Sequence, residues 1–272
     1  MVWVIKAIIV PIKPTLVMKK FKLSIMAMLL MGAVACNKTY NSTTPKSGSA
    51  PTANAGVSTD DAADMVSGSL SLNSNGLANV ANDVTFNAAS MPNTHQACGT
   101  VKADTISRQS GSGASVTYSY NLTYSFMLLC DTSNHPDSLS SSLIYSGSYN
   151  GPNISTTNSG SSIFTVGGLL ASAPDFVING EYKSAGSFKS KTDTAKNGNN
   201  SIDIVVKGLT LKKPGRTIVS GTASISVSGD VPKKGNFSYT GTIVFNNDGT
   251  ATLTLNGTVY TINLYTGVKT RH

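Results

Sequence analysis

Apolar and polar residues alternate along most of the chain beyond residue 80, as they do in β-strands with one buried face. In the clearest case, residues 116–130, every second residue from Val116 to Cys130 is apolar or aromatic. The residues between them are Thr, Ser and Asn as far as Ser125. A strand of this length would extend for about 50 Å. We therefore expect it to bend, to carry a β-bulge or to pass from one sheet to another.

The C-terminal third repeats the alternation and separates its strands with turn sequences. The segments 247–249 (Asn-Asp-Gly) and 256–257 (Asn-Gly) are typical of tight hairpins, so this third predicts a meander. Weaker alternation predicts further strands at 98–107, 141–149, 163–167, 176–188 and 201–211. The pattern predicts an all-β fold, a single antiparallel β-sandwich or partly open barrel of about nine or ten strands.

One short helix is expected before the strands. Ser58 or Thr59 can cap its start, and Asp60 and Asp61 suit the positive end of the helix dipole. Ala, Met, Val and Leu residues between 62 and 72 supply one apolar side. We expect this N-terminal helix to close one end of the sheet, and we expect no helix after residue 80.

Composition and charge narrow the possible functions. Only 12% of the 272 residues are charged, and Glu181 is the only glutamate. This composition excludes a coiled coil, a helical bundle and a highly charged tail protein, and it makes an enzyme with several carboxylates unfavourable. The net charge is +8, but five lysines lie before residue 36, which leaves 16 cations against 13 acids from there on. That excess is too small to indicate a nucleic-acid face.

The N-terminal segment is typical of a secretory signal. Three lysines lie between residues 19 and 22, apolar residues fill 23–31, and four small residues follow at 32–35. The apolar stretch of 13 residues is too short to cross about 30 Å of hydrocarbon as a helix. We interpret residues 1–35 as a signal segment. Within it we expect translation to start at Met18, so that residues 1–17 are upstream sequence read as coding by mistake.

The cysteine directly after these small residues, Cys36, resembles the lipobox cysteine of bacterial lipoproteins, although Ala33 stands where that pattern usually has Leu. The resemblance implies cleavage before Cys36, a diacylglycerol on its sulfur and a fatty acyl chain such as palmitate on its amino group. In such lipoproteins, an Asp directly after the Cys retains the protein in the inner membrane. Asn37 stands at that position here, which implies the outer membrane. No acidic cluster that would direct the protein to the cell surface follows, which implies the periplasmic face. A plain secreted protein and a retained anchor are the alternatives. Residues 36–59 then form the lipidated Cys and a flexible tether, and residues 60–272 the β domain.

Two further cysteines, Cys98 and Cys130, form an even pair in an exported domain and predict a disulfide. The alternative is a zinc site, because His95 lies close to Cys98 and His135 close to Cys130 in the sequence. Two thiolates and two imidazoles are a common tetrahedral ligand set for zinc. With the disulfide formed, we expect both histidines to be ordinary loop residues and no cofactor to be bound.

The sequence lacks a Gly-x-Ser-x-Gly elbow, a His-Glu-x-x-His motif and a phosphate loop. We therefore expect a non-catalytic binding or structural lipoprotein of the cell envelope. Its partners would be the membrane, through the lipid on Cys36, and a glycan or an envelope protein, but not nucleic acid. One alternative is a carrier that encloses an apolar ligand, with the aromatic positions of 118–126 lining the cavity. The other is an envelope-glycan hydrolase, which would pair two Asp residues or Glu181 with an Asp.

Overall fold

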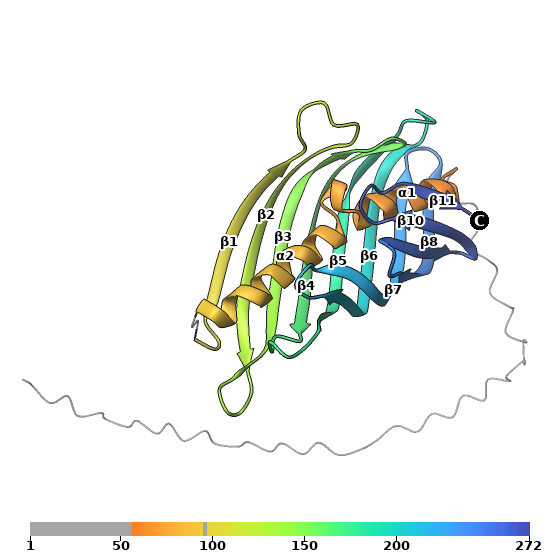
Figure 1. Ribbon diagram of the computed structural model, residues 1–272. Helices are drawn as coiled ribbons and strands as arrows, with labels where there is room; N and C mark the ends of the chain where they lie inside the picture. The colour runs from red at the N-terminus through yellow and green to blue at the C-terminus, as the bar shows by residue number, and fades with distance from the viewer. Residues whose placement is uncertain (1–55, 95–96) are drawn as a thin grey trace, which may run out of the picture. The chain divides into compact units, whose positions relative to one another are not determined.

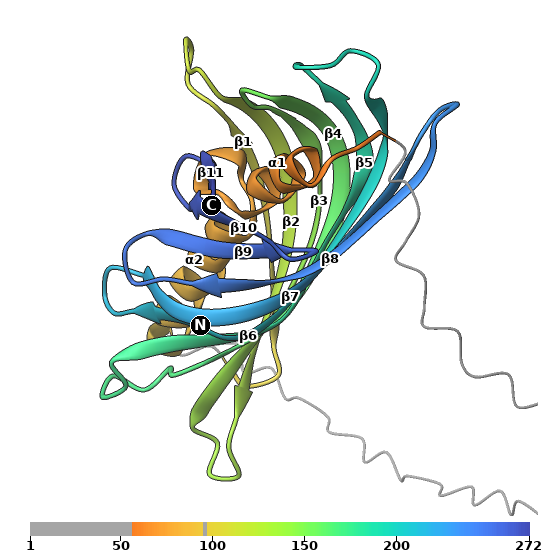
Figure 2. The ribbon, with the colours of Figure 1, turned by 90° about the vertical axis from the view of Figure 1, so that its right-hand side faces the viewer.

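One antiparallel sheet of eleven strands forms the body of the protein, with the strands side by side in sequence order from β1 to β11. The computed structural model describes residues 56–94 and 97–272. Cys36, the signal segment and nearly all of the expected tether lie outside these residues. The sheet is strongly curved, and two helices lie against its concave side (Figures 1 and 2). We call the face that meets the helices the inner face and the opposite one the outer face.

The helical elements precede the sheet in the sequence. They are α1 (Thr59–Leu70), the 3-10 turn η1 (Leu72–Ser74), α2 (Leu77–Ser90) and the 3-10 turn η2 (Met91–Thr94). The strands are β1 (Val101–Gln109), β2 (Thr117–Cys130), β3 (Pro136–Asn150), β4 (Ile154–Gly167), β5 (Asp175–Ser190), β6 (Asn197–Lys212), β7 (Thr217–Val231), β8 (Gly235–Phe245), β9 (Thr250–Leu255), β10 (Thr258–Asn263) and β11 (Lys269–Arg271).

The predicted all-β antiparallel class is confirmed, and the meander of the C-terminal third extends over the whole sheet. The sandwich is not confirmed, because all strands belong to one continuous sheet. The partly open barrel is not confirmed either, since β1 and β11 are the two ends of an open strand order. There are eleven strands rather than nine or ten. The long strand β2 carries the expected irregularity, at Leu129 and Cys130 in its pairing with β3.

The N-terminal helix begins as predicted. The Ser58 hydroxyl accepts a hydrogen bond from the Asp61 backbone N–H at 3.2 Å, and the Asp61 carboxylate accepts one from the Ser58 backbone N–H at 2.7 Å. These two bonds form a capping box. Val57 is only 3% exposed, so the packed part of the protein begins just before residue 60, inside the segment expected to be tether.

The expectation of no helix after residue 80 is wrong, because α2 continues to Ser90. Leu77, Val80, Ala81, Val84 and Ala88 are buried along one side of it, and their spacing of three and four residues is that of a helix. Asn, Asp and Thr residues between them have low helix propensity. Burial of the apolar side against the inner face outweighs that propensity, since each fully buried Val or Leu side chain contributes about 1.5–3 kcal/mol.

A charged contact fixes α2 to the first two strands. The Arg108 guanidinium on β1 donates to both carboxylate oxygens of Asp83 on α2, at 2.6 and 2.8 Å. The Tyr124 hydroxyl on β2 donates to the same carboxylate at 2.6 Å. Arg108 and Asp83 are mostly buried, with 25% and 14% of their side chains exposed. A bidentate pair in such a setting holds both partners in one orientation.

Glycines opposite inner-face aromatic residues leave room for the rings of those residues. Gly147 on β3 pairs with Tyr120 on β2, and Gly160 on β4 pairs with Tyr145 on β3. A Cβ atom on either glycine would collide with the paired tyrosine side chain and with a neighbouring strand's carbonyl oxygen. Each tyrosine therefore covers the space that its glycine leaves open, which is a common role of glycine within a strand.

Candidate functional site

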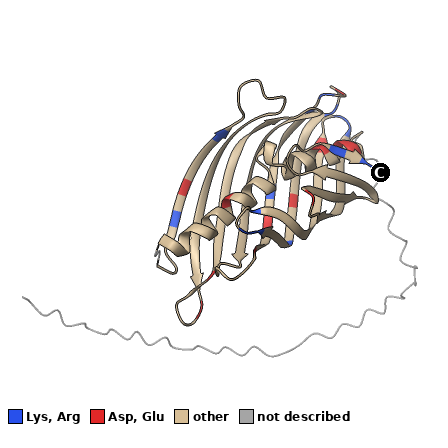
Figure 3. Ribbon diagram, in the orientation of Figure 1, with Lys and Arg blue, Asp and Glu red and all other residues tan. Residues whose placement is uncertain are grey.

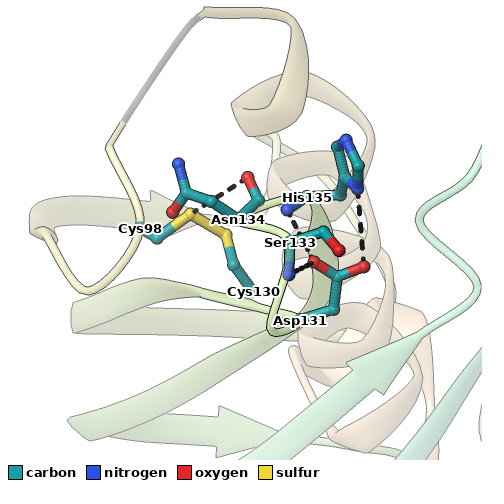
Figure 4. Close-up of a disulfide and its surroundings, with 6 residues drawn as sticks. All are labelled: Cys98, Cys130, Asp131, Ser133, Asn134 and His135. Atoms are coloured by element: carbon teal, nitrogen blue, oxygen red, sulfur yellow. Dashed lines mark hydrogen bonds and ion pairs between the residues drawn. A yellow bond between two sulfur atoms is a disulfide. The ribbon is translucent and has the colours of Figure 1, made fainter.

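The sites predicted from the sequence lie mostly away from the sheet's main surfaces. Cys98 and Cys130 are joined in a disulfide at the lower end of β2, with their Cα atoms 5.9 Å apart (Figure 4). The bond ties the segment before β1 to the end of β2. Because the two sulfur atoms bind each other, neither is available as a thiolate for the alternative zinc set. His95, the fourth member of that set, lies outside the described residues.

His135 lies in the loop between β2 and β3, as expected for a loop residue. Its side chain is 73% exposed, and Nδ1 lies 3.5 Å from the Asp131 carboxylate. Asp131 also accepts hydrogen bonds from the backbone N–H groups of His135 and Ser133, both at 2.8 Å. The bond from the His135 backbone is the largest influence that lowers the pKa of Asp131. This carboxylate therefore shapes a turn, and in residues 56–94 and 97–272 no three metal-ligating side chains gather into a metal site.

The outer face of the sheet carries many exposed hydroxyl and amide side chains. Along β2, β4, β7 and β8 most of its exposed positions are Ser, Thr and Asn, as at Ser119, Asn121 and Thr123. Ile163 and Val244 are exposed aliphatic exceptions. Figure 3 shows how few charged residues the strands carry. Hydroxyl and amide groups donate and accept hydrogen bonds without charge. The outer face therefore suits a neutral, polar partner.

A shallow groove of about 700 Å³ crosses this face over β2 to β5. Hydroxyl and amide side chains line it, together with Gly147, Ala185 and Gly186. The exposed polar lining residues are Ser119, Asn121, Ser146, Ser148, Thr157 and Ser159. Asn121 accepts a hydrogen bond from Ser107 at 2.7 Å through its side-chain oxygen. Asn121 and the neighbouring hydroxyls thus line the groove with hydrogen-bond donors and acceptors.

Glu181 does meet an aspartate, but on the open outer face. The Lys183 ammonium lies 2.8 Å from the Glu181 carboxylate and 3.8 Å from that of Asp203. Desolvation by its surroundings and the negative charge of Glu181 both raise the pKa of Asp203. A glycosidase places its two carboxyl groups on either side of the bond that it cleaves. Here both carboxylates turn towards one ammonium, so the arrangement is an ion cluster.

The inner face is closed by packing. Tyr124 and Phe126 stack at a centroid distance of 5.2 Å and are 1% and 0% exposed. Beneath α1, a cavity of about 10 Å³ lies among Tyr120, Tyr149 and Tyr182, which is room for about one water molecule. Burial raises the pKa of Tyr149 to about 12. The aromatic positions of 118–126 therefore fill the interior and do not line a ligand cavity.

Sequence reasoning missed the groove. The alternation in 116–130 predicted the polar positions Ser119 and Asn121 on one side of it, but no strand was expected at Thr157 and Ser159. Comparison with known proteins identifies no family for this chain. No family model matches the chain, and neither the curated proteins nor the solved structures include a match. In the described part of the chain, both α-helices are too short or too polar to cross a membrane.

Proposed function

We propose that the protein is a lipoprotein anchored in the outer membrane through Cys36, whose sheet domain binds a neutral glycan without cleaving it. The signal-like segment before Cys36 supports the anchor, as the sequence pattern indicates. The binding role rests on one observation, the uncharged groove on the outer face. A periplasmic orientation follows from the residues after Cys36.

The groove suits a glycan because both surfaces offer the same kind of group. A sugar presents hydroxyls that donate and accept, and Ser148, Thr157 and Asn121 offer complementary donors and acceptors. None of the residues that line the groove is charged, so a neutral ligand leaves no charge to desolvate. The open shape of the groove admits an extended chain whose ends continue beyond it.

The two rival functions have less support. A hydrolase would need carboxyl groups on both sides of the bound sugar, whereas Glu181 and Asp203 share Lys183 on an open surface. A carrier would need an internal space, whereas Tyr124 and Phe126 occupy the interior as stacked, buried rings. We therefore favour the non-catalytic binding module.

A binding measurement with a matched pair of variants tests this function. Ser148 and Thr157 face each other across β3 and β4 in the groove, and Ser226 and Thr240 face each other across β7 and β8 outside it. We expect the natural chain to bind at least one of a panel of neutral hexasaccharides, such as chitohexaose, maltohexaose and xylohexaose. Ser148→Leu with Thr157→Leu should weaken that binding at least fivefold, because two hydroxyls are lost and the groove is filled.

The second pair of substitutions is the control. Ser226→Leu with Thr240→Leu makes the same chemical change on the same face, and it should leave the binding unchanged. Mass spectrometry of the hexasaccharide after incubation should show it intact. The proposal fails if no hexasaccharide binds, if both double variants bind equally well, or if the hexasaccharide is shortened.

A further inference from the structure

A second concave site lies beside the β6–β7 hairpin, away from the groove. A cleft of about 240 Å³ opens between η1 and α2 on one side and the ends of β7 and β10 on the other. Its apolar floor is made by Ala78, Ile218 and Leu264, which are 1%, 8% and 4% exposed. The Tyr265 ring stands at the rim and is 63% exposed. An apolar floor with an aromatic rim is typical of sites for small organic molecules.

One charged residue, Arg216, lines this cleft. Its guanidinium carbon lies 5.3 Å from the centroid of the Phe86 ring on α2, so one face of the group is covered. Its Nε atom is buried and has no hydrogen-bond partner among the described residues. The other two arginines of the chain bind carboxylates, Arg108 that of Asp83 and Arg271 that of Asp60. Arg216 has no such ion pair within the described part of the chain.

The acids closest in sequence to the lining residues are already engaged. Asp83 follows Asn82 of the lining, but Arg108 and Tyr124 bind its carboxylate. Asp248 precedes Gly249 of the lining, but its carboxylate accepts two hydrogen bonds from Thr250, at 2.9 and 2.6 Å. Neither carboxylate forms an ion pair with Arg216.

We infer that this cleft binds a small carboxylate with an apolar tail. A guanidinium offers a planar pair of N–H donors that matches the two oxygens of a carboxylate, so the carboxylate lies on Arg216. The tail then covers Ala78, Ile218 and Leu264. The cleft is much larger than the cavity beneath α1 and has room for a short apolar chain, and octanoic acid is a ligand of that kind. The site is independent of the glycan groove.

Calorimetric titration of the full chain with sodium octanoate tests the inference. The chain should carry Cys36→Ser, so that no acyl group of its own competes for the cleft. We expect saturable binding of one octanoate per chain, with octan-1-ol and acetate each at least tenfold weaker, because each lacks one half of the ligand. Arg216→Gln should weaken octanoate binding at least tenfold, and Arg216→Lys should weaken it less.

Lys212→Gln is the matched control, because it removes an exposed cation of the same β6–β7 hairpin that does not line the cleft. It should change octanoate affinity by less than twofold. The inference is overturned if octanoate does not saturate, if octan-1-ol binds as tightly, or if Arg216→Gln binds octanoate like the natural chain. Should circular dichroism show Arg216→Gln to be unfolded, Arg216→Lys and the ligand series on the natural chain decide the matter.

Discussion

The Arg108 guanidinium and the Asp83 carboxylate join the first strand of the sheet to the second helix through two hydrogen bonds, of 2.6 and 2.8 Å. Asp83→Asn should lower the free energy of unfolding by about 2–3 kcal/mol, because it leaves a mostly buried guanidinium without its partner charge. Urea unfolding followed by circular dichroism measures the change. Arg108→Met with Asp83→Leu should be less destabilising than Asp83→Asn, since it removes both charges. Equal stability of Asp83→Asn and the natural chain would show that the pair does not hold the helix.

Close packing around Gly160 predicts that one added methyl group lowers stability strongly. Gly160→Ala should destabilise the fold by about 2–4 kcal/mol, because the new Cβ would collide with the Tyr145 side chain and the Lys183 carbonyl oxygen. Gly111→Ala is the control, because a Cβ there meets nothing within 4 Å. It should be neutral or stabilise the fold slightly, since alanine restricts the unfolded chain. A similar loss of unfolding free energy in both variants would contradict the packing argument.

The buried tyrosines predict instability in alkali. Burial raises the pKa of Tyr149 to about 12 in the folded state, against about 10 in an unfolded chain. Its contribution to stability is therefore complete below about pH 10 and is lost as the pH rises through the folded value. Between pH 9 and pH 11, Tyr149→Phe should lose about 1 kcal/mol less unfolding free energy than the natural chain. Urea unfolding at the two pH values tests this, and an identical loss in both proteins would be evidence against it.

The disulfide closes a loop of 32 residues between Cys98 and Cys130. Replacement of both by Ser should lower the unfolding free energy by about 3–4 kcal/mol in the chain-entropy model. A thiol reagent should react with neither cysteine in the native protein and with both after reduction and unfolding. Two thiols that react before reduction would contradict the pairing.

The sequence predicted those features that depend on neighbours along the chain. Strand β2 was expected at 116–130 and lies at Thr117–Cys130, because alternation of side chains between two faces is a local property. The start of α1 at Ser58 was likewise predicted, because a capping box lies within four residues.

Features that depend on distant segments could not be predicted in this way. Helix α2 is stabilised where its apolar side packs on the sheet, because the Asn, Asp and Thr residues on its other positions have low helix propensity. A single open sheet differs from a sandwich in which strands pair, and here each strand pairs with its neighbours in sequence from β1 to β11. The Arg216 cleft joins residues from four parts of the chain, so the spacing of its residues carries no signal.

Attachment of the chain to a membrane through Cys36 is the central claim, because it decides where the sheet domain meets its partners. The most direct test is the intact mass of the protein purified from membranes of a bacterium that expresses the full chain. We expect a polypeptide that begins at Cys36, carries a diacylglycerol and an amide-linked acyl chain, and contains one disulfide. A chain recovered from the cytosol with residues 18–35 still attached and no added lipid mass would contradict it.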